Sequence, residues 1–311
     1  MSKKRIKWTV ETLTLEKAFD AFVISQMSKG IKDKTIQSYR THFKSLSKHI
    51  DMKMTFEELT KSHIEQMILS MRKSNLAHNS ISSYARVMKT FLNWCKSEGH
   101  TTVEVPTYKQ IEVVKEGYSD EELEKLLKRP SPTDSFCEYR NWVIINFLFN
   151  SGCRSATIRN IQNQDVNLEA NQVIFRHTKN GKIQSIPLCS QMALILRSYM
   201  KVRKGKDSDF LFCDVYGGML TENALRLAIQ RYNHSRGVEK TSIHLFRHTF
   251  ARKYLVDCGG NAFTLQKLLG HSTLKMTKHY CAIYDADIAK NYDKFSPLAQ
   301  ISKPKERLSR R

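Results

Sequence analysis

The sequence predicts a mainly α-helical chain that carries one small β-sheet, which places it in the α+β class. Apolar residues recur at the three- and four-residue spacing of amphipathic helices over most of residues 14–99 and again after Tyr118. Residues 172–188 break this pattern, because apolar and polar side chains alternate there on both sides of Asn180-Gly181. Asn-Gly between alternating segments is a strong signal for a β-hairpin. The 311 residues suffice for one or two domains with a substantial core.

The first domain is expected over residues 12–100 and to contain four amphipathic helices. Glycines end the first and the fourth of these helices, at Gly30 and Gly99. The residues expected to form the shared core are Leu15, Phe19 and Phe22, then Ile36, Tyr39 and Phe43, then Ile64, Met67 and Ile68, and finally Tyr84, Val87, Phe91 and Trp94.

A second domain is expected over residues 118–296, after a linker at 101–117 that lacks helical periodicity and contains Pro106. Ser119 followed by three acidic residues is typical of a helix N-terminus, where the hydroxyl caps the first turn and acids favour the positive helix end. Further helices are predicted at residues 142–149, around 158–161, at 190–200 and at 221–232. Residues 297–311 form a polar, basic C-terminal tail.

The chain is strongly basic. Lys and Arg number 51 against 30 acidic residues, which gives a formal net charge of +21. Such an excess is typical of a protein with a polyanionic partner, although charge alone does not separate a DNA-binding protein from a ribosomal or membrane-surface protein. The basic residues run from Lys3 to Arg311, as expected of a protein that encircles its ligand.

The cysteines and histidines indicate a cytoplasmic protein without a metal. Seven cysteines are scattered and form no Cys-x-x-Cys pair, which favours reduced thiols over disulfides. His244 and His248 are four residues apart, as helical zinc ligands can be, but no His-Glu-x-x-His motif or thiolate cluster accompanies them. Neither a secretory segment nor an apolar run of membrane-spanning length is found, so no membrane partner is expected.

The most informative motif lies late in the second domain: His244-Leu245-Phe246-Arg247-His248-Thr249, then Leu269-Gly270-His271, then Tyr280 nine residues later. Arg and His side chains can hold a phosphodiester and neutralise the charge that develops on it. A tyrosine hydroxyl can then attack the phosphorus. Alone, a His-x-x-Arg pair usually lies on a helix surface and a single tyrosine is usually half buried. Together, in a basic chain, the motif predicts cleavage and rejoining of DNA through a phosphotyrosine.

Two further cations precede this motif. The apolar helix predicted at residues 142–149 runs into a turn at Gly152, and this turn places Arg154 just beyond it. Lys179 lies at the tip of the predicted hairpin, where a flexible ammonium can reach a leaving oxygen. A single lysine in a turn is usually only solvated, so Lys179 gains its meaning from the other motifs.

With these pieces the chain resembles the tyrosine recombinase, or phage integrase, family. The matching segments are Ser151-Gly152-Cys153-Arg154, the Lys179 hairpin, the block from His244 to Ala251, Leu268-Leu269-Gly270-His271-Ser272, and Tyr280. The resemblance covers nearly the whole chain and implies an Xer-like layout: a helical, SAM-like core-binding domain followed by a tyrosine-recombinase catalytic domain, without an additional arm-binding domain. The family usually has an acidic residue three positions after the first arginine, where this chain has Thr157.

The resemblance implies a site-specific DNA recombinase or integrase of a mobile element or chromosome-resolution system. Its catalytic residues would be Arg154, Lys179, His244, Arg247, His271 and Tyr280, the nucleophile. The arginines and histidines would hold the phosphate, with His244 and Arg247 on one helix face, and Lys179 would protonate the departing 5′ oxygen. The nine-residue spacing from His271 selects Tyr280 over the nearby Tyr284. Bond energy is conserved in a 3′-phosphotyrosine, so no ATP, metal or other cofactor is expected.

The expected partners are double-stranded DNA with paired half-sites and three further copies of the chain, or a related recombinase, in a synaptic tetramer. The tail after Pro297 is expected to dock on a neighbouring protomer, as the corresponding segment does in similar recombinases. Two other classes of function stay open. One is a type IB topoisomerase-like enzyme that only relaxes DNA, and the other is a catalytically weakened DNA-binding relative, which Thr157 would fit.

Overall fold

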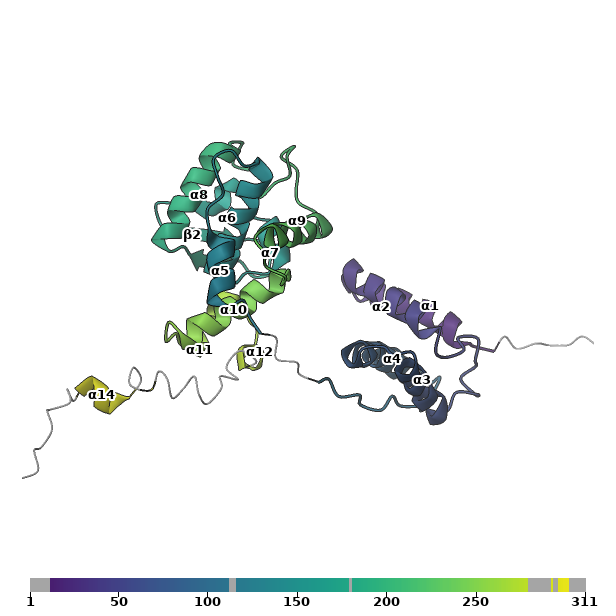
Figure 1. Cartoon of the computed structure of the whole chain (residues 1–311). Coiled ribbons are helices and arrows are strands. Elements are labelled where there is room, and N and C mark those ends of the chain that lie inside the picture. The colour runs from purple at the N-terminus through teal and green to yellow at the C-terminus, as the bar shows by residue number, and fades with distance from the viewer. Residues whose placement is uncertain (1–11, 112–115, 179–180, 279–291, 293–295, 302–311) are drawn as a thin grey trace, which may run out of the picture. The chain divides into compact units, whose positions relative to one another are not determined.

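The computed structural model of the chain (Figure 1) describes residues 12–111, 116–178, 181–278, 292 and 296–301. It is mainly helical with one three-stranded sheet, which confirms the predicted fold class. The chain divides into two compact units, Met1–Val113 and Val114–Arg311. Among the described residues, no helix is both long enough and apolar enough to cross a membrane.

The first unit consists of four helices: α1 (Leu15–Ser28), α2 (Asp33–Leu46), α3 (Lys61–Lys73) and α4 (His78–Ser97). The backbone N–H of Lys17 donates to the hydroxyl of Thr14, and this cap starts α1. The apolar faces of the helices meet around Phe19, which stacks on Phe43 with ring centroids 3.6 Å apart. Phe91 packs edge-on against both rings. Most of the predicted core residues are observed there, but Val87 is not among them, and Ala85 and Met88 of α4 are buried instead.

Residues 101–111 have no regular secondary structure but pack against the first unit. Val105 is buried in its core. The side-chain amide of Asn79, at the start of α4, donates to the carbonyl of Ile111 at 3.1 Å and accepts from its N–H at 3.2 Å. The segment expected as a linker is therefore held along α4 as far as Ile111.

The second unit contains the remaining elements. Its helices and strands are α5 (Asp120–Leu127), α6 (Phe136–Ser151), α7 (Ser155–Arg159), a 3₁₀ turn (Asn163–Asp165), β1 (Val166–Asn167), β2 (Gln172–Phe175), β3 (Gln184–Pro187), α8 (Ser190–Arg203), α9 (Glu222–Ser235), α10 (Ile243–Val256), α11 (Ala262–Leu269), α12 (Leu274–Lys278) and α14 (Pro297–Ile301). The expected cap at Ser119 is present, because its hydroxyl accepts from the N–H of Glu122 while the Glu122 carboxylate accepts from the N–H of Ser119.

The core of this unit is built around α6, which Figure 1 shows in its middle. This helix is apolar on nearly all sides and contacts α5, α8, α9 and α10. It begins at Phe136, six residues before the predicted start at Trp142, because the Ser135 hydroxyl accepts from the N–H of Glu138 and caps an earlier turn. The side chains of its first turn are only partly buried, which explains why apolar periodicity did not mark that turn.

The sheet is antiparallel in the order β1-β2-β3. The predicted hairpin pairs β2 with β3, with Gln172 opposite Pro187 and Phe175 opposite Gln184. Val173, Phe175 and Ile186 point into the core, as alternation requires. β1 pairs with β2 and was not predicted, because its two residues are too few to produce an alternating pattern.

Candidate active site

The turn between α6 and α7 positions Arg154. α6 ends at Gly152, which has a φ of +58°, and a Cβ atom there would lie 2.5 Å from the Phe250 ring. Both the backbone conformation and the close approach of Phe250 therefore require glycine. Cys153 and Arg154 follow in the turn, and Arg154 occupies the N-cap position of α7. The Ser-Gly-Cys-Arg segment thus turns the chain sharply and presents Arg154 at the start of the next helix.

Arg247 joins three parts of the second unit. It lies on α10 and is only 5% exposed. Its Nη1 donates to the carbonyl of Gly152 at 2.9 Å, and its Nη2 donates to the carbonyl of Leu269 at 3.0 Å. Because carbonyl oxygens are neutral, these bonds orient the guanidinium without cancelling its charge.

His271 follows the glycine that ends α11. Its Nε2 lies 2.6 Å from Nη2 of Arg247, and its Nδ1 lies 2.8 Å from the Oγ1 atom of Thr277 on α12. Burial, followed by the positive charges of Arg247 and Arg154, lowers the pKa of His271 from its usual 6.5 to about 4. His271 is therefore neutral near pH 7. Because arginine can only donate, Nε2 must be the acceptor, and the ring proton must lie on Nδ1.

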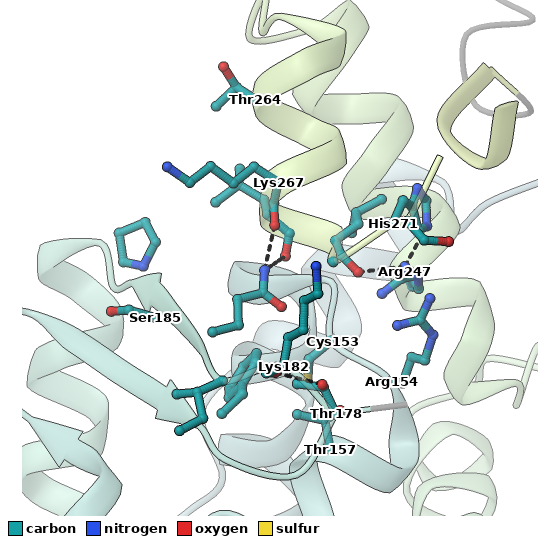
Figure 2. A pocket seen from close by; sticks show the side chains of 18 of the residues that line it. Cys153, Arg154, Thr157, Thr178, Lys182, Ser185, Arg247, Thr264, Lys267 and His271 are labelled. Atoms are coloured by element: carbon teal, nitrogen blue, oxygen red, sulfur yellow. Dashed lines mark hydrogen bonds between the residues drawn. The ribbon is translucent and has the colours of Figure 1, made fainter. Parts of the chain in front are cut away.

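These residues line one pocket of about 880 Å³. Arg154, Arg247 and His271 form one side of it, the β2–β3 hairpin forms another, and the end of α11 closes it. Figure 2 shows the guanidiniums of Arg154 and Arg247 side by side in this pocket, with His271 next to Arg247. A concave site with several cations and hydrogen-bond donors is suited to a phosphate group.

The hairpin is fixed to the end of α11 by Gln184 on β3. Its side-chain amide donates to the carbonyl of Leu268 at 2.9 Å and also to the carbonyl of Lys267. Both carbonyls belong to the last turn of α11, and that of Lys267 also accepts from the N–H of Gly270 at 3.1 Å. Gln184 therefore holds the hairpin against the segment that leads into His271.

The structure brings together three of the six predicted residues: Arg154, Arg247 and His271. His244 lies one turn before Arg247 on α10 but is exposed, and it is not among the residues that line the pocket. Lys179 and Tyr280 lie outside the described residues, as does the rival Tyr284. Their neighbours in the chain are described: Thr178 lines the pocket, and Thr277 bonds His271.

Other residues of the pocket were not predicted as functional. Lys182 extends from the hairpin into the pocket (Figure 2), and its place in the same turn as Lys179 was the available signal for it. Thr157, which stands where the family usually has an acid, is 6% exposed and also lines the pocket. Cys153 lies beside Arg154, and burial raises the pKa of its thiol to about 11, so it stays protonated and is a poor nucleophile.

Comparison with known proteins identifies the family. Residues 118–287 match the phage integrase family, and residues 14–110 match the phage integrase SAM-like domain. The chain belongs to the phage integrase family. It is a tyrosine-type site-specific recombinase, an enzyme that cleaves and rejoins DNA strands.

Relatives of this recombinase match over almost their full length. Tyrosine recombinase XerD of Staphylococcus haemolyticus is 26% identical over 287 residues, covering 88% of this chain and 96% of the relative. Tyrosine recombinase XerC of Oceanobacillus iheyensis is 25% identical over 311 residues, covering 93% and 99%. Tyrosine recombinase XerA of Saccharolobus solfataricus is 25% identical over 285 residues, covering 88% and 91%.

Solved structures share the fold of this recombinase. The Tn1549 transposon integrase in complex with a circular intermediate DNA has a TM-score of 0.76 at 19% identity, with 92% of this chain and 100% of that chain covered. A lambda integrase tetramer bound to a Holliday junction has a TM-score of 0.72 at 18% identity, with 87% and 78% covered.

Proposed function

We propose that this recombinase cleaves each DNA strand by attack of the Tyr280 hydroxyl on a phosphodiester held by Arg154, Arg247 and His271. The observation that supports the proposal is the meeting of these three residues, from segments far apart in the sequence, at one pocket. In the reaction the bond between the tyrosine oxygen and phosphorus forms while the bond from phosphorus to the 5′ oxygen breaks. The product is a 3′-phosphotyrosine and a free 5′ hydroxyl. Religation runs the same steps in reverse with another strand.

The two arginines supply the charge that the transition state needs. The pentavalent phosphorus places extra negative charge on its non-bridging oxygens, and planar guanidiniums can donate paired hydrogen bonds to them. Arg247 is suited to this role because its carbonyl bonds to Gly152 and Leu269 fix its plane before DNA arrives. A group that is already oriented needs no reorganisation during the reaction.

The pKa of His271 would rise when a phosphate binds. Without an anion, burial and two nearby cations keep it neutral, and its Nε2 accepts from Arg247. A phosphodiester beside Arg154 and Arg247 would offset their charge, raise the pKa of His271 and favour the form that donates to the phosphate. The role of phosphate donor assigned to His271 therefore belongs to the DNA-bound state.

Proton transfer to the leaving 5′ oxygen is assigned to Lys179. The lysine belongs to the hairpin whose described residues Thr178 and Lys182 both line the pocket. Thr178 Oγ1 donates to the carbonyl of Lys182 at 2.7 Å and joins the two sides of the turn in which Lys179 stands. A flexible ammonium in such a turn can follow the oxygen as the bond breaks.

The proposed substrate is double-stranded DNA with paired half-sites, recombined by four copies of this chain or by this chain with a related recombinase. The solved neighbours include a recombinase tetramer on a Holliday junction and an integrase on DNA. The net charge of +21 suits a polyanion. We further propose that the protein acts in a reducing, cytoplasmic compartment, which the six free cysteines in the described part of the chain support.

A strand-exchange assay tests this function. Two linear duplexes that carry the recombination site should yield exchanged products in a reaction that needs the protein in at least fourfold excess over synapsed site pairs. A supercoiled plasmid without that site should not be relaxed. Relaxation without exchange would favour a topoisomerase-like activity, and binding with neither activity would favour a DNA-binding relative.

A further inference from the structure

Thr277 has an environment unlike that of its neighbours on α12. Its side chain is fully buried, at 0% exposure, whereas Leu274 and Met276 of the same short helix are each 42% exposed. A threonine hydroxyl placed in such an environment needs a hydrogen-bond partner. The partner is Nδ1 of His271, 2.8 Å away and six residues earlier in the chain.

The hydrogen bonds on the two sides of the His271 ring depend on each other. Arg247 Nη2 can only donate, so it requires a bare lone pair on Nε2, 2.6 Å away. The neutral ring then carries its proton on Nδ1, and this proton needs an acceptor, which the Thr277 hydroxyl oxygen supplies. The opposite tautomer would set an N–H of the ring against the N–H of Arg247. Arg247 and Thr277 therefore favour this tautomer together, Arg247 by requiring a bare Nε2 and Thr277 by accepting from Nδ1–H.

We propose that Thr277 is a positioning residue that fixes the Nδ1–H tautomer of His271 and, through it, the Arg247 guanidinium in the phosphate-binding pocket. The proposal rests on the assignment of His271 and Arg247 to the active site made above. Thr277 also stands three residues before Tyr280 in the sequence. The same bond therefore anchors α12, which leads toward the nucleophile, to the residue that contacts the phosphate.

Two substitutions separate the hydroxyl from the volume of the side chain. Thr277→Val keeps the shape and removes the acceptor, and Thr277→Ser keeps the acceptor and removes a methyl group. In single-turnover cleavage of a nicked suicide substrate at saturating protein, Thr277→Val should be roughly ten- to a hundredfold slower, because it leaves a buried donor unpaired. Thr277→Ser should remain within about threefold of the natural protein, and the DNA affinity of both should stay nearly unchanged.

The tautomer itself can be observed by ¹⁵N NMR of protein labelled at histidine, with His271→Gln used to assign the His271 signals. The natural protein and Thr277→Ser should show a protonated Nδ1 and a bare Nε2 at neutral pH, and Thr277→Val should lose this pattern. Any of three results would overturn the proposal. The natural protein could carry the ring proton on Nε2, the Thr277→Val variant could cleave at the natural rate, or the Thr277→Ser variant could be as slow as Thr277→Val. The NMR result holds even if His271→Gln cleaves normally, in which case the assignment of His271 to the active site would be wrong.

Discussion

Arg247 and His271 combine an observed structural role with the chemical role proposed for them. The Arg247 guanidinium joins the turn after α6, the end of α11 and His271 through hydrogen bonds of 2.6–3.0 Å. These partners are neutral, so a buried positive charge faces the pocket and is available to an anion. Arg154 has its backbone at the N-cap of α7.

Arg154→Lys and Arg247→Lys should each slow strand cleavage by roughly two orders of magnitude, because an ammonium cannot reproduce the planar pair of donors. Arg247→Lys should also lower the melting temperature, since the carbonyls of Gly152 and Leu269 lose their donors. Gel-shift affinity should change far less, because the other basic residues of the chain remain available to the DNA backbone. A lysine variant that cleaved at the natural rate would remove that arginine from the catalytic set.

The lowered pKa of His271 predicts a dependence of stability on pH. The folded protein holds this group neutral down to about pH 4, whereas in the unfolded chain it takes up a proton near pH 6.5. Between these values the unfolded state binds more protons, so the contribution of His271 to stability is full above pH 6.5 and is lost as the pH falls toward 4. Thermal melts of the natural protein should fall more steeply over this window than those of His271→Gln. If the melting temperatures of the two proteins changed in parallel with pH, the His271 imidazole would not be held neutral in the folded state.

At the level of elements, the sequence predicted those parts that depend on local chemistry. Helical spacing marked the four helices of the first unit, and Asn180-Gly181 marked the hairpin, because each pattern repeats within one element. The meeting of Arg154, Arg247 and His271 was predicted from their resemblance to a family motif, and they do line one pocket. The bond from Gln184 to the end of α11 links residues more than 80 positions apart and leaves no periodic trace. For the same reason nothing in the pattern singled out Thr277 or the exposure of His244.

Gln184→Leu should loosen the hairpin and slow cleavage. The change removes the amide that donates to the carbonyls of Lys267 and Leu268, so the hairpin is no longer held beside His271. We expect roughly tenfold slower cleavage from the loss of these two hydrogen bonds, and faster amide hydrogen exchange in β2, β3 and the last turn of α11. Gln164→Leu is the matched control, because the side chain of Gln164 is exposed and donates to the side chain of Gln162 rather than to another element. Equal behaviour of the two variants would contradict the role of Gln184.

At the level of the whole molecule, exchange between two duplexes requires more than one recombinase protomer. Each chain supplies one proposed catalytic set, and an exchange between two duplexes needs four strand cuts. α14 lies in the C-terminal tail and exposes Leu298 (72%) and Ile301 (85%), two apolar side chains on one face of a short helix. Apolar side chains exposed on a basic tail favour contact with another protein surface. We therefore expect this segment to bind a neighbouring protomer.

Deletion of the residues after Pro297 should leave binding to a single site largely intact but impair synapsis and strand exchange. Substitution of both Leu298 and Ile301 by serine should reproduce the defect, because it removes the apolar contact and keeps the basic residues that follow. Gel-shift assays measure the first property, and exchange between two labelled duplexes measures the second. Full-rate exchange by the truncated protein would show that the tail is dispensable.

The central claim is that Tyr280 carries the DNA during the reaction, and covalent trapping tests it most directly. A nicked suicide substrate loses the small fragment that would permit religation, so the protein stays attached to the DNA. Digestion and mass spectrometry of the trapped complex should place the phosphotyrosine on Tyr280, and Tyr280→Phe should bind the site without forming the adduct, while Tyr284→Phe forms it. An adduct on Tyr284, or an adduct that persists in Tyr280→Phe, would contradict the account.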